Sequence, residues 1–365
     1  MNERQKRLLA ALTSPDVDVV GVFGPTGTGK SFITCMYGIQ AVKDGKYSQF
    51  VVIRPLVDAN TGKTYNTIEL RDLFFELASS YLYDLTSKYL EEGEVKRLAD
   101  EGKILLADPS FIGGRTFDDS LVFLDDAQHL PSEAIYEAML RIGNDSKLVI
   151  AGDPVFQVAG GFNGATIARE ALLGLDRTLV IDFGISDIVR PGARRAFRLA
   201  LETRIRRRPL SEDERKVLSI VLAHASDAQI VTIVDLRRFK EKHEIRNVPD
   251  ALIISKSGYL GRIIGRGGER IRRIEEESGL TLRGVELDLD FKPLISAIHP
   301  VGWIRKHILE TDVIGNNLEV QVRSEEYGAF VGRGGSHIRF IDDVFRELLG
   351  IGVKATSIER RGKKK

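Results

Sequence analysis

The chain has 365 residues and a net charge of +1, and this length predicts two or three domains. With 43% hydrophobic and 29% charged residues, it is typical of soluble globular proteins. No apolar run approaches the roughly 18 to 20 residues of a membrane span, and "MNERQKRLLAAL" has no apolar signal core, so we expect a cytoplasmic protein. The single cysteine, Cys35, excludes an intramolecular disulfide and is expected to pack in a core; the histidines show no zinc spacing.

Four short aliphatic or β-branched runs alternate with helical periodicity in the first part of the chain: residues 17–23, 50–54, 121–125 and 147–151. Such near-continuous apolar strands are typical of a parallel sheet covered on both faces, so residues 1–208 form one predicted α/β domain. Residues 67–101 are a predicted helical insertion. We expect its aromatic side chains to lie in the core rather than to stack on RNA: Phe74, Phe75, Tyr81 and Tyr83.

The octapeptide "GPTGTGKS" lies between the first apolar run and a predicted helix, and it fits G-x-x-x-x-G-K-[ST], the phosphate-binding P-loop. Glycines let backbone N–H groups wrap phosphates at the helix N-terminus. We expect Lys30 to reach the β- and γ-phosphates of ATP and Ser31 to bind Mg²⁺. The predicted nucleotide site comprises Gly24, Pro25, Thr26, Gly27, Thr28, Gly29, Lys30 and Ser31.

Two later strands end in polar residues. "LVFLDDAQ" ends in two acids; Asp125 suits a magnesium ligand, and Asp126 suits a carboxylate that orients the attacking water. Without a P-loop, such a strand end would be equally typical of a helix N-cap. "VIAGDPVFQ" places Asp153 and Gln157 at the same edge of the sheet, where open α/β sheets bind ligands.

A strongly basic segment follows, "RPGARRAFRLALETRIRRR" at 190–208, with eight arginines and one acidic residue. It would attract polyanions unless its arginines pair with acids elsewhere in the chain. Residues 209–249 contain a predicted capping box from Ser211 to Glu214, a helix through Ala223 and a strand at "QIVTIV". We assign this segment only as a connector.

The rest of the chain contains a duplicated pattern of strand, short helix, Gly-Arg-Gly-Gly, basic helix and strand. The loop fails the dinucleotide fingerprint, because Arg270 stands where the third glycine should be, and it fits instead the G-x-x-G of a KH domain, which clamps an RNA backbone. Lys256, Arg272, Arg273 and His337 could extend the grooves. The expected RNA-binding residues are Gly265, Arg266, Gly267, Gly268, Arg270, Gly332, Arg333, Gly334, Gly335 and Arg339.

The N-terminal domain resembles the PhoH family of P-loop ATPases, relatives of superfamily 1 helicases. The resemblance rests on "NERQKRLLAAL", "GPTGTGKS", "VVIRP", "GRTFDDSLVFLDDAQ", "AGDPVFQ" and "GISDIVRPGARRAF", in family order. It implies a RecA-like fold, with Gln5 reading adenine, Arg54 near phosphate or nucleic acid, and Gln157 sensing the γ-phosphate. It also implies that Arg190 is an arginine finger offered to a neighbouring subunit, and it leaves the role of Arg115 open.

This resemblance has one departure and one consequence. The family's Asp-Glu-Ala-Gln is Asp125, Asp126, Ala127 and Gln128 here, so the second carboxylate is one methylene shorter, which puts its efficiency as a base in doubt. A finger supplied by a neighbour implies a homo-oligomer, by resemblance a hexameric ring.

The C-terminal pair is similar to the tandem KH domains of NusA-type transcription factors, particularly archaeal ones. We expect two small α+β type II KH domains, at 250–290 and 291–365, that bind single-stranded RNA. The alternative is a pair of degenerate KH folds kept as protein-docking surfaces. The final "RRGKKK" is either an electrostatic aid to RNA binding or a solubilising tail.

The combined expectation is an ATPase that uses ATP and Mg²⁺ to remodel, translocate or unwind bound RNA. The alternative is an RNA-binding protein, for example in rRNA processing or ribosome assembly, for which ATP is a conformational switch without unwinding. A small-molecule P-loop kinase would explain residues 24–31 but neither "DDAQ" nor the repeated loop.

Overall fold

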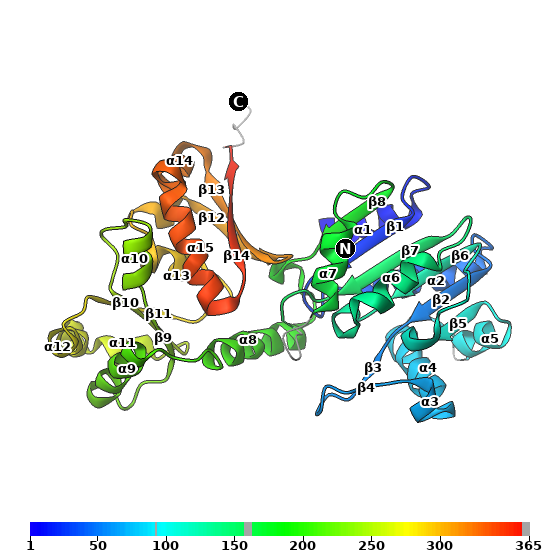
Figure 1. Ribbon diagram of the computed structural model, residues 1–365, viewed down its shortest axis with the longest axis horizontal. Coiled ribbons are helices and arrows are strands. Elements are labelled where there is room, and N and C mark those ends of the chain that lie inside the picture. Colours follow the sequence, from blue (N-terminus) through cyan, green and yellow to red (C-terminus); the bar gives the residue numbers. More distant parts are fainter. Residues whose placement is uncertain (92, 157–162, 360–365) are drawn as a thin grey trace. The chain divides into compact units, whose positions relative to one another are not determined.

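The computed structural model describes residues 1–91, 93–156 and 163–359. The chain forms two compact units, Met1–Arg194 and Arg195–Lys365, which are described one at a time. Figure 1 labels their elements along the chain. Within the described residues, no helix is both long and apolar enough to cross a bilayer.

The first unit contains a six-stranded sheet in the order β5-β2-β6-β7-β1-β8, and every neighbouring pair is parallel. Its strands are β1 (Val19–Phe23), β2 (Gln49–Ile53), β5 (Ile104–Ala107), β6 (Ser120–Leu124), β7 (Lys147–Gly152) and β8 (Thr178–Asp182). Parallel pairing brings the carboxyl ends of β1, β2, β6 and β7 to one edge of the sheet. The predicted α/β class is confirmed.

Helices cover both faces of this sheet (Figure 1). One apolar layer packs α1 (Glu3–Thr13), α2 (Lys30–Lys43), α4 (Asp72–Thr86) and α5 (Glu94–Asp100) against alternate strand residues such as Phe50 and Phe123. The intervening residues, such as Val51 and Val122, face α6 (Ser132–Leu140) and α7 (Gly164–Leu172). This alternation explains why the strands read as continuous apolar runs. Cys35 is buried in the first layer, as expected.

The insertion consists of three helices, with α3 (Thr67–Leu70) preceding α4 and α5, and it follows a short hairpin of β3 (Leu56–Val57) and β4 (Thr64–Tyr65). Arg71 has a positive φ of 52°, which ends α3 and separates it from α4. The prediction that its aromatics are core residues is confirmed for Phe74, which is 1% exposed, and wrong for Phe75 and Tyr83, which are 48% and 47% exposed. The buried residues of α4 are Phe74, Leu82 and Thr86.

The second unit contains two three-stranded sheets with the same plan. In the first, β10 (Ala251–Ser255) lies between parallel β11 (Leu282–Glu286) and antiparallel β9 (Ile230–Asp235). In the second, β13 (Asn317–Arg323) lies between parallel β14 (Gly352–Ile358) and antiparallel β12 (Ile308–Ile314). The accompanying helices are α9 (Glu212–His224), α10 (Arg237–Lys242), α11 (Leu260–Ile264), α12 (Glu269–Ser278), α13 (Lys292–Ile298), α14 (Tyr327–Val331) and α15 (Ser336–Leu349).

Residues 209–249 are part of the first small domain rather than the connector that the sequence suggested. The capping box forms, since the Ser211 hydroxyl accepts from the Glu214 N–H and the Glu214 carboxylate accepts from the Ser211 N–H. Val217 and Val221 of α9 then pack against Ile253 and Ile274, and β9 completes the sheet. The repeat is therefore longer than the sequence indicated, because α9 and β9 correspond to α13 and β12.

The basic helix α8 (Pro191–Arg206) crosses the boundary between the units, so the first unit ends at Arg194 and not at the predicted residue 208. Arg206 of this helix and Arg208 after it are paired with carboxylates. Arg206 contacts Glu202 at 2.9 Å, and buried Arg208, just after the helix, pairs with Glu214 and with Glu347 at 3.0 Å each. Part of the basic run thus stabilises the second unit.

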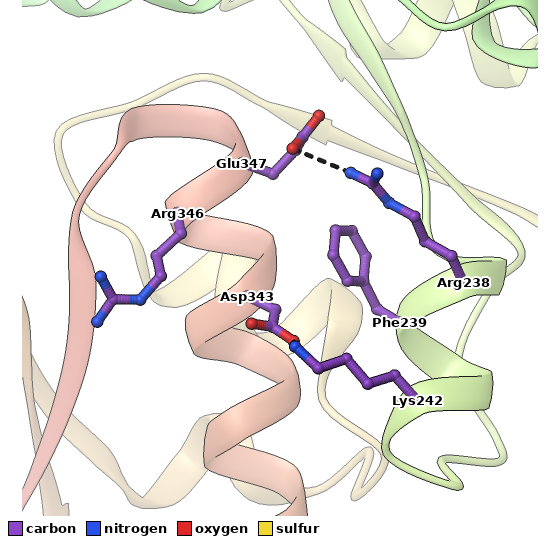
Figure 2. A pocket seen from close by; sticks show the side chains of 6 residues that line it. All are labelled: Arg238, Phe239, Lys242, Asp343, Arg346 and Glu347. Atoms are coloured by element: carbon purple, nitrogen blue, oxygen red, sulfur yellow. Dashed lines mark hydrogen bonds and ion pairs between the residues drawn. The ribbon is translucent and has the colours of Figure 1, made fainter.

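Ion pairs also join α10 to α15 across a surface hollow (Figure 2). Arg238 pairs with Glu347 at 2.9 Å, and Lys242 pairs with Asp343 at 2.7 Å. The hollow is lined by Arg238, Phe239, Lys242, Asp343, Arg346 and Glu347. Each cation that lines the hollow, Arg346 included, pairs with a carboxylate, so the hollow presents little net charge to a polyanion. The pairs between α10 and α15 also hold the two small domains together.

Candidate nucleotide and nucleic-acid sites

The predicted P-loop connects β1 to α2 at the carboxyl edge of the parallel sheet. Two of its glycines are required, one by close packing and one by its backbone conformation. A Cβ at Gly24, where φ is 139°, would lie 2.3 Å from the Phe183 carbonyl oxygen. Gly29 caps α2 in the left-handed conformation at φ 93°, which glycine adopts without strain. The loop therefore has the tight turn at a helix N-terminus that cradles phosphate groups.

Lys30 is buried at the start of α2, and its ammonium lies within the loop. The Lys30 Nζ donates to the carbonyl oxygens of Gly24 and Pro25 at 2.7 and 2.9 Å. Burial lowers the pKa of Lys30, and the nearby carboxylates of Asp153 and Asp125 act in the opposite direction. These carbonyls are the partners that a bound phosphate would replace.

Ser31 and Asp125, the two predicted magnesium ligands, meet at the end of the loop. The Ser31 hydroxyl donates to the Asp125 Oδ1 at 3.1 Å, and the Tyr81 hydroxyl donates to the Asp125 Oδ2 at 2.6 Å. Burial, together with the negative charge of Asp126, raises the pKa of Asp125 to about 6. The pair offers hard oxygen donors beside a phosphate loop, which fits Mg²⁺, since this ion takes one or two protein ligands and fills its other positions with phosphate oxygens and water.

Asp126 follows directly, at the left-handed φ of 54°. Its Oδ2 accepts from the Nε and Nη2 of Arg54 at 2.8 and 2.6 Å, and its Oδ1 accepts from the Gln128 side chain at 3.1 Å. The Arg54 charge lowers the pKa of Asp126 despite the opposing effect of burial. Arg54, which was expected near phosphate or nucleic acid, thus lies on the carboxylate predicted to orient water.

Gln128 is the last residue of the Asp-Asp-Ala-Gln motif, and the sequence predicted no role for it. Its Oε1 accepts from the Asp153 N–H at 3.1 Å, so one amide links the ends of β6 and β7. The Asp153 carboxylate itself accepts from the N–H groups of Val155 and Phe156 and shapes the turn after β7. Gln157, the predicted γ-phosphate sensor, lies outside the described residues.

Gln5 lies against the P-loop, where its Nε2 donates to the Thr28 carbonyl oxygen at 2.9 Å. It is held there by the N-cap of α1, since its backbone N–H and its Oε1 bond to Asn2 at 2.8 and 3.0 Å. Asn2 in turn donates to Asp187 at 2.9 Å. Asp187 was not singled out in the sequence, yet it ties the N-terminus to the segment that carries Arg190.

Arg190 is exposed and lies beside the P-loop of its own chain. The Val189 N–H donates to the Gly27 carbonyl oxygen at 3.0 Å. A Cβ built on Gly27 would lie 3.7 Å from the Arg190 Cβ. The backbone of Arg190 therefore lies beside the P-loop of the same chain. Arg115 is exposed too, after the turn that follows β5.

The two Gly-Arg-Gly-Gly loops have nearly the same backbone. The first glycines, Gly265 and Gly332, have φ of 74° and 76°, and the third residues, Gly267 and Gly334, have φ of 62° and 57°. A Cβ on either third residue would meet open space. Arg266 and Arg333 are exposed at the second position, and the last glycines, Gly268 and Gly335, cap α12 and α15 in the left-handed conformation.

The flanking basic residues differ between the loops. Arg270 pairs with Asp227 at 2.7 Å, and Arg272 donates to the Gly267 carbonyl oxygen. His337 takes the place of Arg270 in the second copy and contacts the Ala329 carbonyl oxygen through Nδ1 at 3.0 Å. Arg339 lies against Gly335. Arg270 is thus less available to a phosphate than the sequence suggested.

Comparison with known proteins assigns the first unit. Residues 1–202, more than half of the chain, match the family described as "PhoH-like protein". The chain belongs to the PhoH-like family. Residues 251–286 match the KH domain family, so this PhoH-like protein carries a KH domain at its first Gly-Arg-Gly-Gly loop.

Curated PhoH-like proteins match about half of the chain. The one from Bacillus subtilis is 32% identical over 192 residues, which covers 51% of this chain and 58% of the relative. Those from Synechocystis and Mycobacterium tuberculosis are 27% and 29% identical, with 46% and 51% of this chain and 52% and 53% of the relatives covered. This chain therefore spans little more than half of the length of the relatives it matches.

Two solved structures that resemble the chain do so distantly. The large terminase of a thermophilic bacteriophage, in complex with ADP, gives a TM-score of 0.35 at 14% identity and covers 58% of this chain and 50% of its own. The Pif1 helicase of Candida albicans gives 0.30 at 11% identity and covers 70% and 63%. Similarity of this size supports no argument about activity.

Proposed function

We propose that this PhoH-like protein is an RNA-binding ATPase that couples ATP hydrolysis to the remodelling or unwinding of RNA. One observation carries the proposal. A P-loop with Lys30 inside it, and Ser31 in contact with Asp125, occurs in the same chain as a KH domain with an intact G-x-x-G loop.

ATP would bind with its phosphates in the loop of residues 24–31. Lys30 would exchange its loop carbonyls for β- and γ-phosphate oxygens, and Ser31 and Asp125 would hold Mg²⁺. When bound, the ion neutralises the charge that develops on the phosphates. Asp126 and Gln157 would position the attacking water.

Asp126 first has to be released by Arg54, because its two oxygens are already bonded. A carboxylate that is paired with a guanidinium is a weak base, so basal hydrolysis should be slow. We infer that an anionic ligand near Arg54, such as the γ-phosphate or RNA, frees Asp126.

The RNA would lie along the two glycine-rich loops. The second small domain repeats the sheet order and the loop backbone of the KH domain, and we interpret it as a second type II KH domain in a NusA-like tandem. Glycines let a strand approach the backbone closely, while Arg266 and Arg333 supply charge to phosphates. Intact loops in both copies favour RNA binding over a role in protein docking only.

We retain the homo-oligomer, in family terms a hexameric ring, as a proposal about assembly. The position of Arg190 beside Gly27 of its own chain favours a role in stabilising charge on the nucleotide of the same subunit over the role across subunits that the resemblance implied.

The decisive experiment is steady-state ATP hydrolysis with and without single-stranded RNA, with Lys30→Ala as the inactive control. We expect RNA to raise the rate severalfold and Lys30→Ala to abolish it. A basal rate near zero that RNA leaves unchanged, together with an effect of ATP on RNA affinity, would replace the motor with a nucleotide switch. Strand displacement on a tailed duplex then tests unwinding itself.

A further inference from the structure

Tyr81 contacts the predicted magnesium ligand although it lies in the helical insertion. Its hydroxyl, from the inward side of α4, donates to the Asp125 Oδ2 at 2.6 Å. The other carboxylate oxygen, Oδ1, accepts from Ser31 at 3.1 Å. Asp125 is only 3% exposed, so these two hydroxyls determine which oxygen faces the P-loop.

Tyr81 is also held in place by Arg54. The Arg54 guanidinium carbon lies 3.7 Å from the centre of the Tyr81 ring, while its nitrogens bond to Asp126. A guanidinium above an aromatic face restricts both groups. One tyrosine therefore ties α4 to both carboxylates at the end of β6.

A short hydroxyl bond to a carboxylate is strong when it is buried, and it restricts rotation of the carboxylate. Groups that orient a metal ligand without touching the metal commonly change metal affinity by about 10- to 100-fold. With Oδ2 occupied by Tyr81, Oδ1 stays directed at Ser31, which is the arrangement that a shared Mg²⁺ needs.

We propose that Tyr81 is a positioning residue for the magnesium–nucleotide site, and that it makes Mg²⁺ affinity depend on the position of α4. The inference rests on the proposed nucleotide binding and deepens it, because it assigns control of the site to an insertion outside the P-loop motifs. If Tyr81 instead competed with the ion for Asp125, its hydroxyl would weaken Mg²⁺ binding, and the sign of the effect separates the two roles.

The test uses Tyr81→Phe in the full chain, which removes the hydroxyl and keeps the ring beneath Arg54. A fluorescent ADP analogue is titrated first in EDTA and then, at fixed concentration, with MgCl₂. We expect unchanged affinity in EDTA and a Mg²⁺ midpoint raised by roughly tenfold. Tyr83→Phe is the matched control, because Tyr83 lies on the same helix with an exposed ring, and it should behave as the wild type.

An unchanged or lowered Mg²⁺ midpoint in Tyr81→Phe, with normal binding by the wild type, overturns this inference alone. Failure of the wild type to bind the analogue at any Mg²⁺ concentration overturns the proposed function and this inference together. Thermal unfolding of both variants confirms that the comparison is made between folded proteins.

Discussion

His299 is a buried imidazole beneath the second glycine-rich loop. It contacts the Phe330 carbonyl oxygen through Nε2 at 3.0 Å and accepts from the Val301 N–H through Nδ1 at 3.0 Å. Its ring stacks on Phe330, and His337 lies edge-on to it. Burial lowers the pKa of His299 to about 4, so the neutral form is the one that fits the fold.

This pKa predicts a loss of stability in mild acid. Because the folded pKa of about 4 lies below the unfolded value of about 6.5, the unfolded chain binds more protons between these values. Stability should be full above pH 6.5 and fall by up to roughly 3 kcal/mol as the pH drops to 4. Urea unfolding at several pH values measures the slope. His299→Gln keeps a donor and an acceptor but cannot gain a proton, so a slope equal to that of the wild type would contradict the assignment.

Arg208 is a second residue whose environment determines its role. Its guanidinium pairs with Glu214, and the two side chains are only 7% and 5% exposed. Replacing it with methionine would leave a buried carboxylate unpaired, and we expect Arg208→Met to destabilise the second unit by about 3 to 5 kcal/mol. Arg207→Met is the control, since Arg207 is exposed on the same segment. Equal denaturation midpoints for the two variants would show that the ion pair between Arg208 and Glu214 does not contribute to stability.

At the scale of elements, the two glycine-rich loops offer matched variants. Asparagine and aspartate both tolerate the left-handed conformation at Gly267 and Gly334, and a Cβ there meets open space. They have nearly the same size and shape, and the main difference between them is the negative charge of aspartate. We expect the double change to aspartate to weaken single-stranded RNA binding by roughly tenfold or more for each loop, and the double change to asparagine to weaken it much less. Fluorescence anisotropy with labelled RNA measures this.

The asparagine pair also separates the alternatives. If both pairs of variants bind RNA as the wild type does, the loops do not contact the RNA backbone, and protein docking becomes the better interpretation. If RNA-stimulated ATP hydrolysis falls while basal hydrolysis stays unchanged in the aspartate pair, the KH domains and the P-loop form one motor.

At the scale of the whole molecule, the position of Arg190 predicts the result of mixing subunits. Lys30→Ala and Arg190→Ala should each be inactive. If Arg190 acts on the nucleotide of its own chain, a mixture of the two variants stays inactive. We expect this outcome because Arg190 lies beside Gly27 of its own chain. Recovered activity would support a finger offered across subunits. Sedimentation of the wild type over a range of concentrations tests the ring separately.

Local patterns predicted much of this protein. The P-loop, the end of β6 and both Gly-Arg-Gly-Gly loops occur where their motifs indicated, because each depends on residues close together in the chain whose glycines determine the backbone. The parallel sheet was also predictable, since strands covered on both faces read as continuous apolar runs. The prediction of a capping box from Ser211 to Glu214 was also correct, because it depends on two residues three positions apart.

The errors concern partners that are distant in sequence. The sequence of residues 209–249 did not indicate that β9 would pair with β10. The strand β12 has the same place in the second copy but a different sequence, so the predicted repeat left out β9 and β12. The sequence predicted the same burial for Phe75 and Tyr83 as for Phe74. The orientation of α4 against the rest of the unit leaves these two side chains exposed.

The sequence by itself determined the fold class, the phosphate loop and the two Gly-Arg-Gly-Gly loops, because the patterns that indicate them depend on residues close together in the chain. Only the tertiary structure decided what the candidate site residues touch: Asp125 contacts Tyr81, Asp126 contacts Arg54, and Arg190 lies beside Gly27 of its own chain. These contacts join residues 44, 72 and more than a hundred and fifty positions apart, and such contacts depend on how strands and helices pack and not on local spacing.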